Sequence, residues 1–191
     1  MARSSEDIVN NGEKKEEAFS WKRELCSWIL IFVIAIGAAF LINTFVIINA
    51  VVPTGSMENT IQVDDRLIGL RFAYWNSDPQ RGDIVIFKFP DDEKENYIKR
   101  VVGLPGDHIK ITNGVIEING KVWEDGYAKE AWDFTSDQEY VVPKDSYFML
   151  GDNRNSSEDS RFWNNKYVHK DKILGKAVLR YWPLTDIGKL E

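Results

Sequence analysis

The longest apolar stretch of the chain runs from Trp28 to Ala50 and contains no charged residue. Its polar residues, Asn43, Thr44 and Asn49, all lie toward its end. A helix of this length rises far enough to cross a hydrocarbon core of about 30 Å with some tilt. A cleavable signal peptide fits less well, because its apolar region is only about 7–15 residues long. The pattern therefore predicts one transmembrane helix over residues 28–50.

Beyond residue 50, short β-branched and aromatic runs bounded by turn residues replace the long apolar stretch, and no helical stripe appears. Asn113-Gly114 and Asn119-Gly120 supply the positive φ that two-residue hairpin turns need, which predicts a three-strand meander. The domain is predicted to be mostly β, with strands at Ile84–Phe89, Tyr97–Val102, His108–Thr112, Val115–Ile118, Lys121–Trp123, Tyr147–Leu150 and Lys176–Trp182.

Basic residues flank the apolar run unequally. Lysines and arginines near a span tend to stay on the cytoplasmic side, whereas acidic residues count little. Only Arg66 and Arg71 follow the run closely, while four basic residues precede it: Lys14, Lys15, Lys22 and Arg23. The sequence therefore predicts a cytoplasmic tail over 1–27, one pass of the plasma membrane over 28–50 and an extracytoplasmic domain over 51–191.

Composition excludes several classes of protein. The net charge of −6 argues against nucleic acid as a partner, because phosphate binding needs a dense basic patch. Cys26 is the only cysteine, so no intrachain disulfide can form and the outer domain has no cysteine nucleophile of the sortase kind. Paired His/Cys spacings and an HExxH motif are also missing, so neither a metal nor another cofactor is expected.

Ser56 lies a few residues beyond the apolar run, where a chain leaves the membrane surface. A serine hydroxyl is a weak nucleophile until a base takes its proton. The usual base is histidine, but His108 and His169 both lie in polar surroundings without an obvious orienting carboxylate. A lysine is the remaining candidate, provided that burial lowers its pKa from about 10.4.

Lys99 meets that condition on the sequence pattern. Within the predicted strand Tyr97–Val102 it shares a face with Tyr97 and Val101, while Arg100 points to the opposite face. An inward lysine between an aromatic residue and a valine is in the apolar surroundings that desolvate an amine. The alternative is an exposed basic pair on an edge strand.

Four blocks of the sequence together resemble the bacterial type I signal peptidases (leader peptidases), in the compact form with a single anchor that is common in Gram-positive bacteria. They occur in the family's order behind an N-terminal anchor: Pro53–Met57, Arg81–Val85, Tyr97–Asp107 and Gly151–Arg161. The resemblance implies a partly closed β-barrel of antiparallel sheets. It also implies a membrane-bound serine endopeptidase that removes signal peptides from secreted preproteins with small residues near the cleavage site.

The same resemblance assigns roles to individual residues. Ser56 matches the nucleophile and Lys99 the general base of a serine–lysine dyad, a variant of the triad in which lysine replaces histidine. Thr54 matches the hydroxyl that helps to build the oxyanion hole. Ser157 matches the serine that orients the lysine amine, and two further positions match a supporting charged pair: Asp159 and Arg161.

Other features of the sequence leave alternatives open. Met57 is a candidate for lining the substrate pocket, and Asn155 stands where the family often has aspartate. The segment Phe72–Trp75 either dips into the membrane interface or belongs to the core or a strand. A self-cleaving repressor-type peptidase is disfavoured because such proteins are soluble. A membrane-anchored adhesion or assembly module without catalysis is the alternative from a different class.

Overall fold

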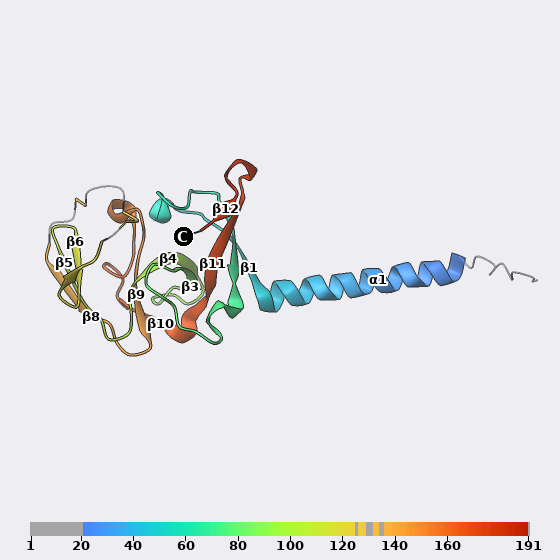
Figure 1. Cartoon of the computed structure of the whole chain (residues 1–191), viewed down its shortest axis with the longest axis horizontal. Coiled ribbons are helices and arrows are strands. Elements are labelled where there is room, and N and C mark those ends of the chain that lie inside the picture. The colour runs from blue at the N-terminus through green and yellow to red at the C-terminus, as the bar shows by residue number, and fades with distance from the viewer. Residues whose placement is uncertain (1–20, 125, 129–131, 134–135, 191) are drawn as a thin grey trace, which may run out of the picture. The chain divides into compact units, whose positions relative to one another are not determined.

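The structure is a computed structural model that describes residues 21–124, 126–128, 132–133 and 136–190. The chain divides into two compact units, residues 1–39 and 40–191. Helix α1 (Trp21–Leu41) has no buried residue, although its side chains are mostly apolar. Within the described residues, one helical stretch, Trp21–Val46, is long and apolar enough to cross a membrane (Figure 1).

The apolar run does not end as a helix. After α1 the backbone forms one wider turn, η1 (Ile42–Val46), and then strand β1 (Ile47–Val51), whereas the predicted helix continued to Ala50. Strand β1 pairs in antiparallel fashion with β2 (Arg66–Leu70). The β-branched residues at this end of the run fit a strand as well as they fit a membrane helix, because apolar character alone does not distinguish the two.

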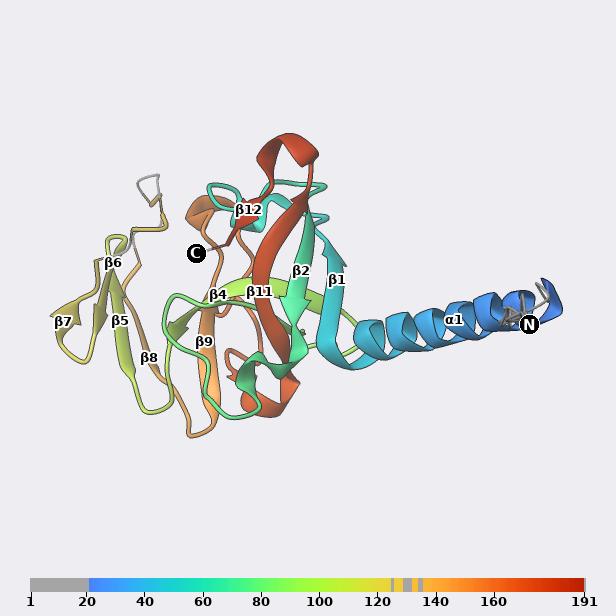
Figure 2. The ribbon, with the colours of Figure 1, turned by 45° about the vertical axis from the view of Figure 1, so that its right-hand side comes forward.

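The larger sheet contains the strands that surround the candidate site. Its order is β1-β2-β11-β3-β4-β9-β10, with β12 paired to β11. Figure 2 shows β1, β2 and β11 side by side, and neighbouring strands are antiparallel throughout. The remaining strands of this sheet are β3 (Ile84–Lys88), β4 (Asn96–Gly103), β9 (Ser146–Leu150), β10 (Val168–His169), β11 (Ile173–Trp182) and β12 (Gly188–Lys189).

The smaller sheet has the order β7-β6-β5-β8 and confirms the predicted meander. Asn113 and Asn119 have φ values of 49° and 54°, and the glycine after each also has positive φ, as the hairpin turns require. Strand β8 completes the sheet by pairing with β5 on its other side. The four strands are β5 (His108–Thr112), β6 (Val115–Ile118), β7 (Lys121–Val122) and β8 (Gln138–Val141).

The mostly β fold predicted from the sequence is confirmed, and each predicted strand is present within a few residues of its expected bounds. Strands β1, β2, β8, β10 and β12 were not predicted. Short 3-10 turns connect the strands, at Gly55–Met57 (η2), Arg71–Tyr74 (η3), Arg154–Ser156 (η4), Lys170–Lys172 (η5) and Leu184–Asp186 (η6).

Three groups of buried apolar residues form the core of the β unit. Strand β4 contributes to all of them, because Ile98, Val101 and Val102 each belong to or pack against a different group. From Lys99 to Gly103 every residue of β4 is buried. Polar side chains on this part of β4, including that of Lys99, are therefore shielded from solvent.

Candidate active site

Ser56 lies on the 3-10 turn η2, which follows β1 after Val52, Pro53 and Thr54. Its side chain is buried, with 8% of its surface exposed. The backbone of this turn is held from the far end of the chain, because Asn153 N donates to Ser56 O at 3.1 Å. The Asn153 side chain also donates to Gly55 O at 3.0 Å. The turn that presents the serine is therefore fixed by a loop about a hundred residues later.

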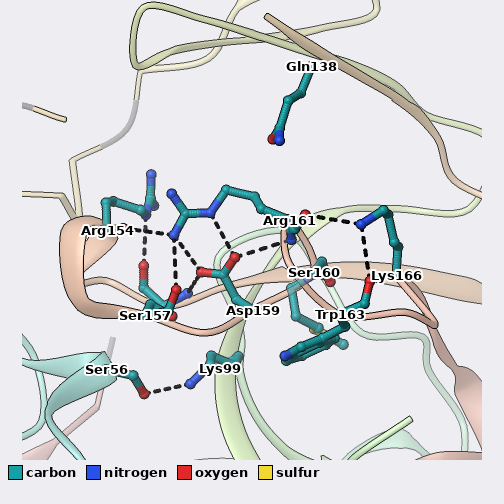
Figure 3. A network of polar contacts seen from close by, with 12 residues as sticks. Ser56, Lys99, Gln138, Arg154, Ser157, Asp159, Ser160, Arg161, Trp163 and Lys166 are labelled. Atoms are coloured by element: carbon teal, nitrogen blue, oxygen red, sulfur yellow. Dashed lines mark hydrogen bonds and ion pairs between the residues drawn. The ribbon is translucent and has the colours of Figure 1, made fainter. Parts of the chain in front are cut away.

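Lys99 reaches the same point from β4. Its Nζ donates to Ser56 Oγ at 2.5 Å, as Figure 3 shows, and only 4% of its surface is exposed. The amine also lies 5.6 Å from the centre of the Tyr97 ring, on the strand face that the sequence predicted. The structure thus brings the two expected partners into direct contact, 43 residues apart in sequence.

The electrostatics of the site favour a neutral amine. Burial lowers the pKa of Lys99 from 10.5 to about 8, because an ammonium ion loses hydration inside the protein. The carboxylates of Asp159 and Glu158 act in the opposite direction but do not cancel this effect. At pH 7 about a tenth of the lysine is therefore unprotonated, against far less than a hundredth for an ordinary lysine.

A cavity of about 750 Å³ leads to the Ser56–Lys99 pair. One wall is β1 and its continuation, which supply apolar residues such as Ile48 and Val52, and the opposite wall is the first half of β4. Both walls have a backbone edge without a strand partner among the described residues. Strand β1 pairs only with β2, and β4 pairs with β9 only from Arg100 onward.

A buried ion pair beside Lys99 was not anticipated. Arg100 binds Asp152 in a bidentate manner, with N–O distances of 2.8 and 2.7 Å and both side chains fully buried. Thr60 Oγ1 donates to the same carboxylate at 2.6 Å. The pair therefore connects the strand of Lys99 to the segment that follows Ser56. The acidic residue in the Gly-Asp-Asn sequence at 151–153 is the feature that could have indicated this ion pair.

The pair expected to brace the site is formed. Arg161 contacts both carboxylate oxygens of Asp159, at 2.7 and 2.9 Å, and both side chains are buried. Asp159 also accepts a hydrogen bond from Gly151 N at 3.1 Å. A side chain at Gly151 has no room, because a Cβ there would lie 2.4 Å from Ser56 O and 2.2 Å from Ser157 Oγ. This glycine lets the supporting loop touch the nucleophile turn.

The other residues expected at the site differ in their exposure and in their hydrogen bonds. Thr54 is exposed and lines the cavity, and Met57 lines it while being buried to 1% exposure. Ser157 is buried beside Gly151, but its Oγ has no hydrogen-bond partner among the described residues, so the expected contact with the lysine amine is not made. Asn155 Oδ1 accepts a hydrogen bond from Asp133 N at 3.0 Å.

Neither histidine belongs to the site. The His108 ring lies 3.8 Å from Glu139, and the His169 ring lies 2.6 Å from Asp171, with all these side chains more than half exposed. Both are surface residues, as the sequence indicated. Neither residue lines the cavity that leads to Ser56.

A buried serine bonded to a buried lysine thus lies at the end of a cavity in a β domain. The profile of the family described as "Signal peptidase, peptidase S26" matches residues 25–182. The chain belongs to this signal peptidase family, as the four sequence blocks indicated, and is a peptidase of the serine type.

Two bacterial relatives with similar sequences support this assignment. The chain is 37% identical to a probable signal peptidase I-2 of Synechocystis, over 97% of this chain and 86% of that protein. It is 35% identical to signal peptidase I P of Bacillus subtilis subsp. natto, over 87% of this chain and 94% of that one. A crystal structure of a signal peptidase I from Enterococcus faecalis aligns with a TM-score of 0.46 and 30% identity, over 52% of this chain and 97% of that chain.

Proposed function

We propose that this protein is a membrane-bound serine endopeptidase that removes N-terminal signal peptides from secreted preproteins, with Ser56 as nucleophile and Lys99 as general base. The observation that carries the proposal is the 2.5 Å contact between a buried amine and a buried hydroxyl at the end of a cavity. The family and the names of the relatives support the reaction and the substrate class.

Acylation starts from the neutral form of Lys99, in which the hydroxyl of Ser56 donates its proton to Nζ. Oγ attacks the scissile carbonyl carbon, and the carbonyl oxygen becomes an oxyanion. The resulting ammonium then gives its proton to the leaving amine as the peptide bond breaks, which leaves an ester between Ser56 and the signal peptide. In deacylation the neutral amine takes a proton from water, and the hydroxide attacks the ester carbon. The ammonium returns the proton to Ser56 Oγ as the bond between Oγ and the acyl carbon breaks, and the signal peptide leaves with a free carboxylate.

The oxyanion is stabilised by the Ser56 N–H and by the hydroxyl of Thr54, which lies on the wall of the same cavity. Hydrogen bonds from preorganised donors of this kind become stronger as negative charge develops on the oxygen. They therefore accelerate the reaction instead of only binding the substrate. The support for these assignments is that one loop holds η2, through the hydrogen bonds of Asn153 and the close approach of Gly151.

The substrate binds as an extended strand between the two unpaired backbone edges, β1 on one side and the first half of β4 on the other. Strand addition gives affinity through main-chain hydrogen bonds and specificity through pockets for alternate side chains. Apolar residues of both walls, together with Met57, line those pockets. A buried Met57 beside the nucleophile leaves room for small side chains, which suits the A-x-A-like sites of signal peptides.

The decisive experiment uses the full chain in detergent with a preprotein that carries an Ala-x-Ala site. The product N-terminus is sequenced, and the assay is repeated with Ser56→Ala and Lys99→Ala. Both variants are expected to lose at least about 10³-fold in kcat, because each removes one half of the activated nucleophile. Full cleavage by Lys99→Ala near neutral pH would contradict the dyad, and cells unaffected by either variant would favour the non-catalytic adhesion module.

The pH profile is a separate prediction. Only the neutral amine can accept the serine proton, so kcat/KM is expected to rise with pH and to reach half of its plateau near pH 8. The assay uses a peptide substrate without titratable groups, so that the measured pH dependence comes from the enzyme. A limb with a midpoint near pH 6.5 would instead point to a histidine.

A further inference from the structure

A second cavity, of about 330 Å³, lies where the chain leaves its apolar helix. Thr44 and Phe45 of η1 line it, together with Arg71 and Trp75 in and after η3 and Lys170 of η5. It shares no lining residue with the cavity that leads to Ser56. Nothing in the proposed reaction uses this second cavity.

Arg71 is the cation in this cavity without an acidic partner among the described residues. The side chain is half-buried, and its Nε is buried without a hydrogen-bond partner among the described residues. The neighbouring cations are neutralised, Lys170 by Asp78 and Lys176 by Asp83. Because buried polar groups are normally hydrogen-bonded, an unpaired guanidinium at a cavity indicates a site for an anion.

Exposed aromatic residues surround this cation. Trp75 is 71% exposed and packs edge-to-face on Phe72, which is 43% exposed, with ring centres 6.3 Å apart. Phe45, on the cavity wall, is 57% exposed. The segment 72–75 is therefore not a strand: Phe72 and Trp75 are exposed, while Tyr74 packs against the core. Exposed tryptophan beside a cation is typical of the headgroup level of a membrane.

Chain continuity fixes the depth of the cavity. The candidate membrane span, Trp21–Val46, includes Thr44 and Phe45 as part of its last turn. If this span crosses the bilayer, as the proposed function requires, the wall that they form lies at the edge of the hydrocarbon core. That edge is where the phosphates of the lipids begin, and basic pockets at this level bind lipid headgroups.

We propose that this cavity binds the phosphate of a bilayer phospholipid, with Arg71 as its ligand. The planar guanidinium matches the oxygens of a phosphate in charge and in donor geometry. The apolar wall at Phe45 and Trp75 suits the glycerol and the first carbons of the acyl chains, which a free phosphate ion lacks. The lipid fixes η3, and with it the edge of the β domain, at the level of the phosphates.

Binding is tested on the full chain, delipidated in maltoside micelles and titrated with phosphatidylglycerol, with the 1:1 adduct counted by native mass spectrometry. The variant Arg71→Gln removes the charge, and Arg66→Gln is the matched control, because Arg66 is an exposed cation on the same side of the span in sequence. We expect Arg71→Gln to weaken lipid binding about tenfold or more, and Arg66→Gln to change it less than about twofold. Arg71→Lys is expected to fall between wild type and Arg71→Gln.

Several outcomes would overturn the proposal. Equal lipid binding by wild type and Arg71→Gln would show that the guanidinium is not the ligand, and equal displacement of lipid by inorganic phosphate would assign the site to a free ion. If Arg71→Gln does not fold, Arg71→Lys still decides, because lipid binding equal to that of wild type would contradict a ligand that depends on the planar guanidinium. Cleavage of a soluble peptide is measured alongside, so that a failure of lipid binding is distinguishable from a failure of the peptidase.

Discussion

Lys99, the base in the proposed reaction, is a buried amine, and its burial both favours that role and destabilises the fold. Burial disfavours the ammonium form, which lowers the pKa of this lysine to about 8. The unfolded chain keeps the ordinary value of 10.5, so between pH 8 and 10.5 the unfolded state binds more protons than the folded state. Stability therefore rises with pH across that window, and the penalty is complete below it.

The first prediction at the scale of the residue follows from this linkage. Lys99→Met keeps the length of the side chain and removes the charge, so we expect it to abolish cleavage and to stabilise the β domain below pH 8. The gain is up to about 3 kcal/mol at pH 6 and declines toward pH 10.5. Thermal unfolding at pH 6 and pH 10 measures it, with Lys172→Met as a more exposed control. A lower Tm for Lys99→Met at pH 6 would contradict the argument.

Thr54 allows a second test, because its side chain is exposed and its replacement leaves the core intact. Thr54→Val removes the hydroxyl while keeping the shape, and we expect kcat to fall by about 10²–10³ with little change in KM. Thr54→Ser retains the hydroxyl and is expected to retain most of the activity. Equal activity of the valine and serine variants would show that this hydroxyl does not contact the oxyanion.

The sequence could identify the residues that now meet at the site, but only some of their contacts. Alternation along 97–102 placed Lys99 inward, and the Ser-Met turn placed Ser56 beyond the apolar run. The bidentate partner of Arg100 could not be found in this way, because periodicity shows which face a residue is on and not which distant loop covers that face. The predicted contact of Ser157 with the amine is not formed in the structure.

At the scale of elements, the pair Arg100–Asp152 joins β4 to the loop that carries Asn153. Removing one partner of a buried ion pair leaves an uncompensated charge, which typically costs about 3–5 kcal/mol. The same carboxylate holds Thr60, so its loss also frees the segment after the nucleophile turn. The ion pair thus supports both β4, which carries Lys99, and the segment that follows Ser56.

We therefore expect Asp152→Ala to lower the free energy of unfolding by about 3–5 kcal/mol and to reduce kcat in the protein that remains folded. Glu93→Ala is the matched control, since its partner Lys172 and Glu93 itself are substantially exposed, and such pairs contribute about 0–1 kcal/mol. Denaturant unfolding of both variants measures the difference. Similar losses in the two variants would show that burial of the pair is not what matters.

The elements also show where sequence patterns stop being informative. The meander was predictable because Asn-Gly turns demand a specific backbone, which Asn113 and Asn119 adopt. Strand β2 was not predictable, because the alternation of apolar and polar residues in Arg66–Leu70 is short and includes Gly69. This glycine is needed for packing, because a Cβ there would lie 2.7 Å from Ile86 Cδ1. The reason for a glycine at this position becomes apparent only in the structure, where Ile86 of β3 packs against it.

At the scale of the whole molecule, the proposed reaction requires the β domain to face the side of the membrane to which preproteins are exported. The excess of lysine and arginine before the apolar run predicts this orientation. It is tested by treating intact cells with a protease. We expect loss of the β domain and survival of an epitope placed at the N-terminus, and the reverse pattern would contradict the orientation. Lysed cells serve as the control for complete digestion.

The strand β1 has a practical consequence for anyone who needs the β domain without its anchor. Hydropathy alone suggests cutting at Ala50, where the apolar run ends, but the chain is already one wall of the substrate cavity from Ile48 onward. A soluble fragment that starts at Val51 discards that wall and exposes the edge of β2, so we expect it to aggregate and to be inactive. A fragment that starts at Ile42 retains the strand and is the better starting point for crystals and inhibitor screens.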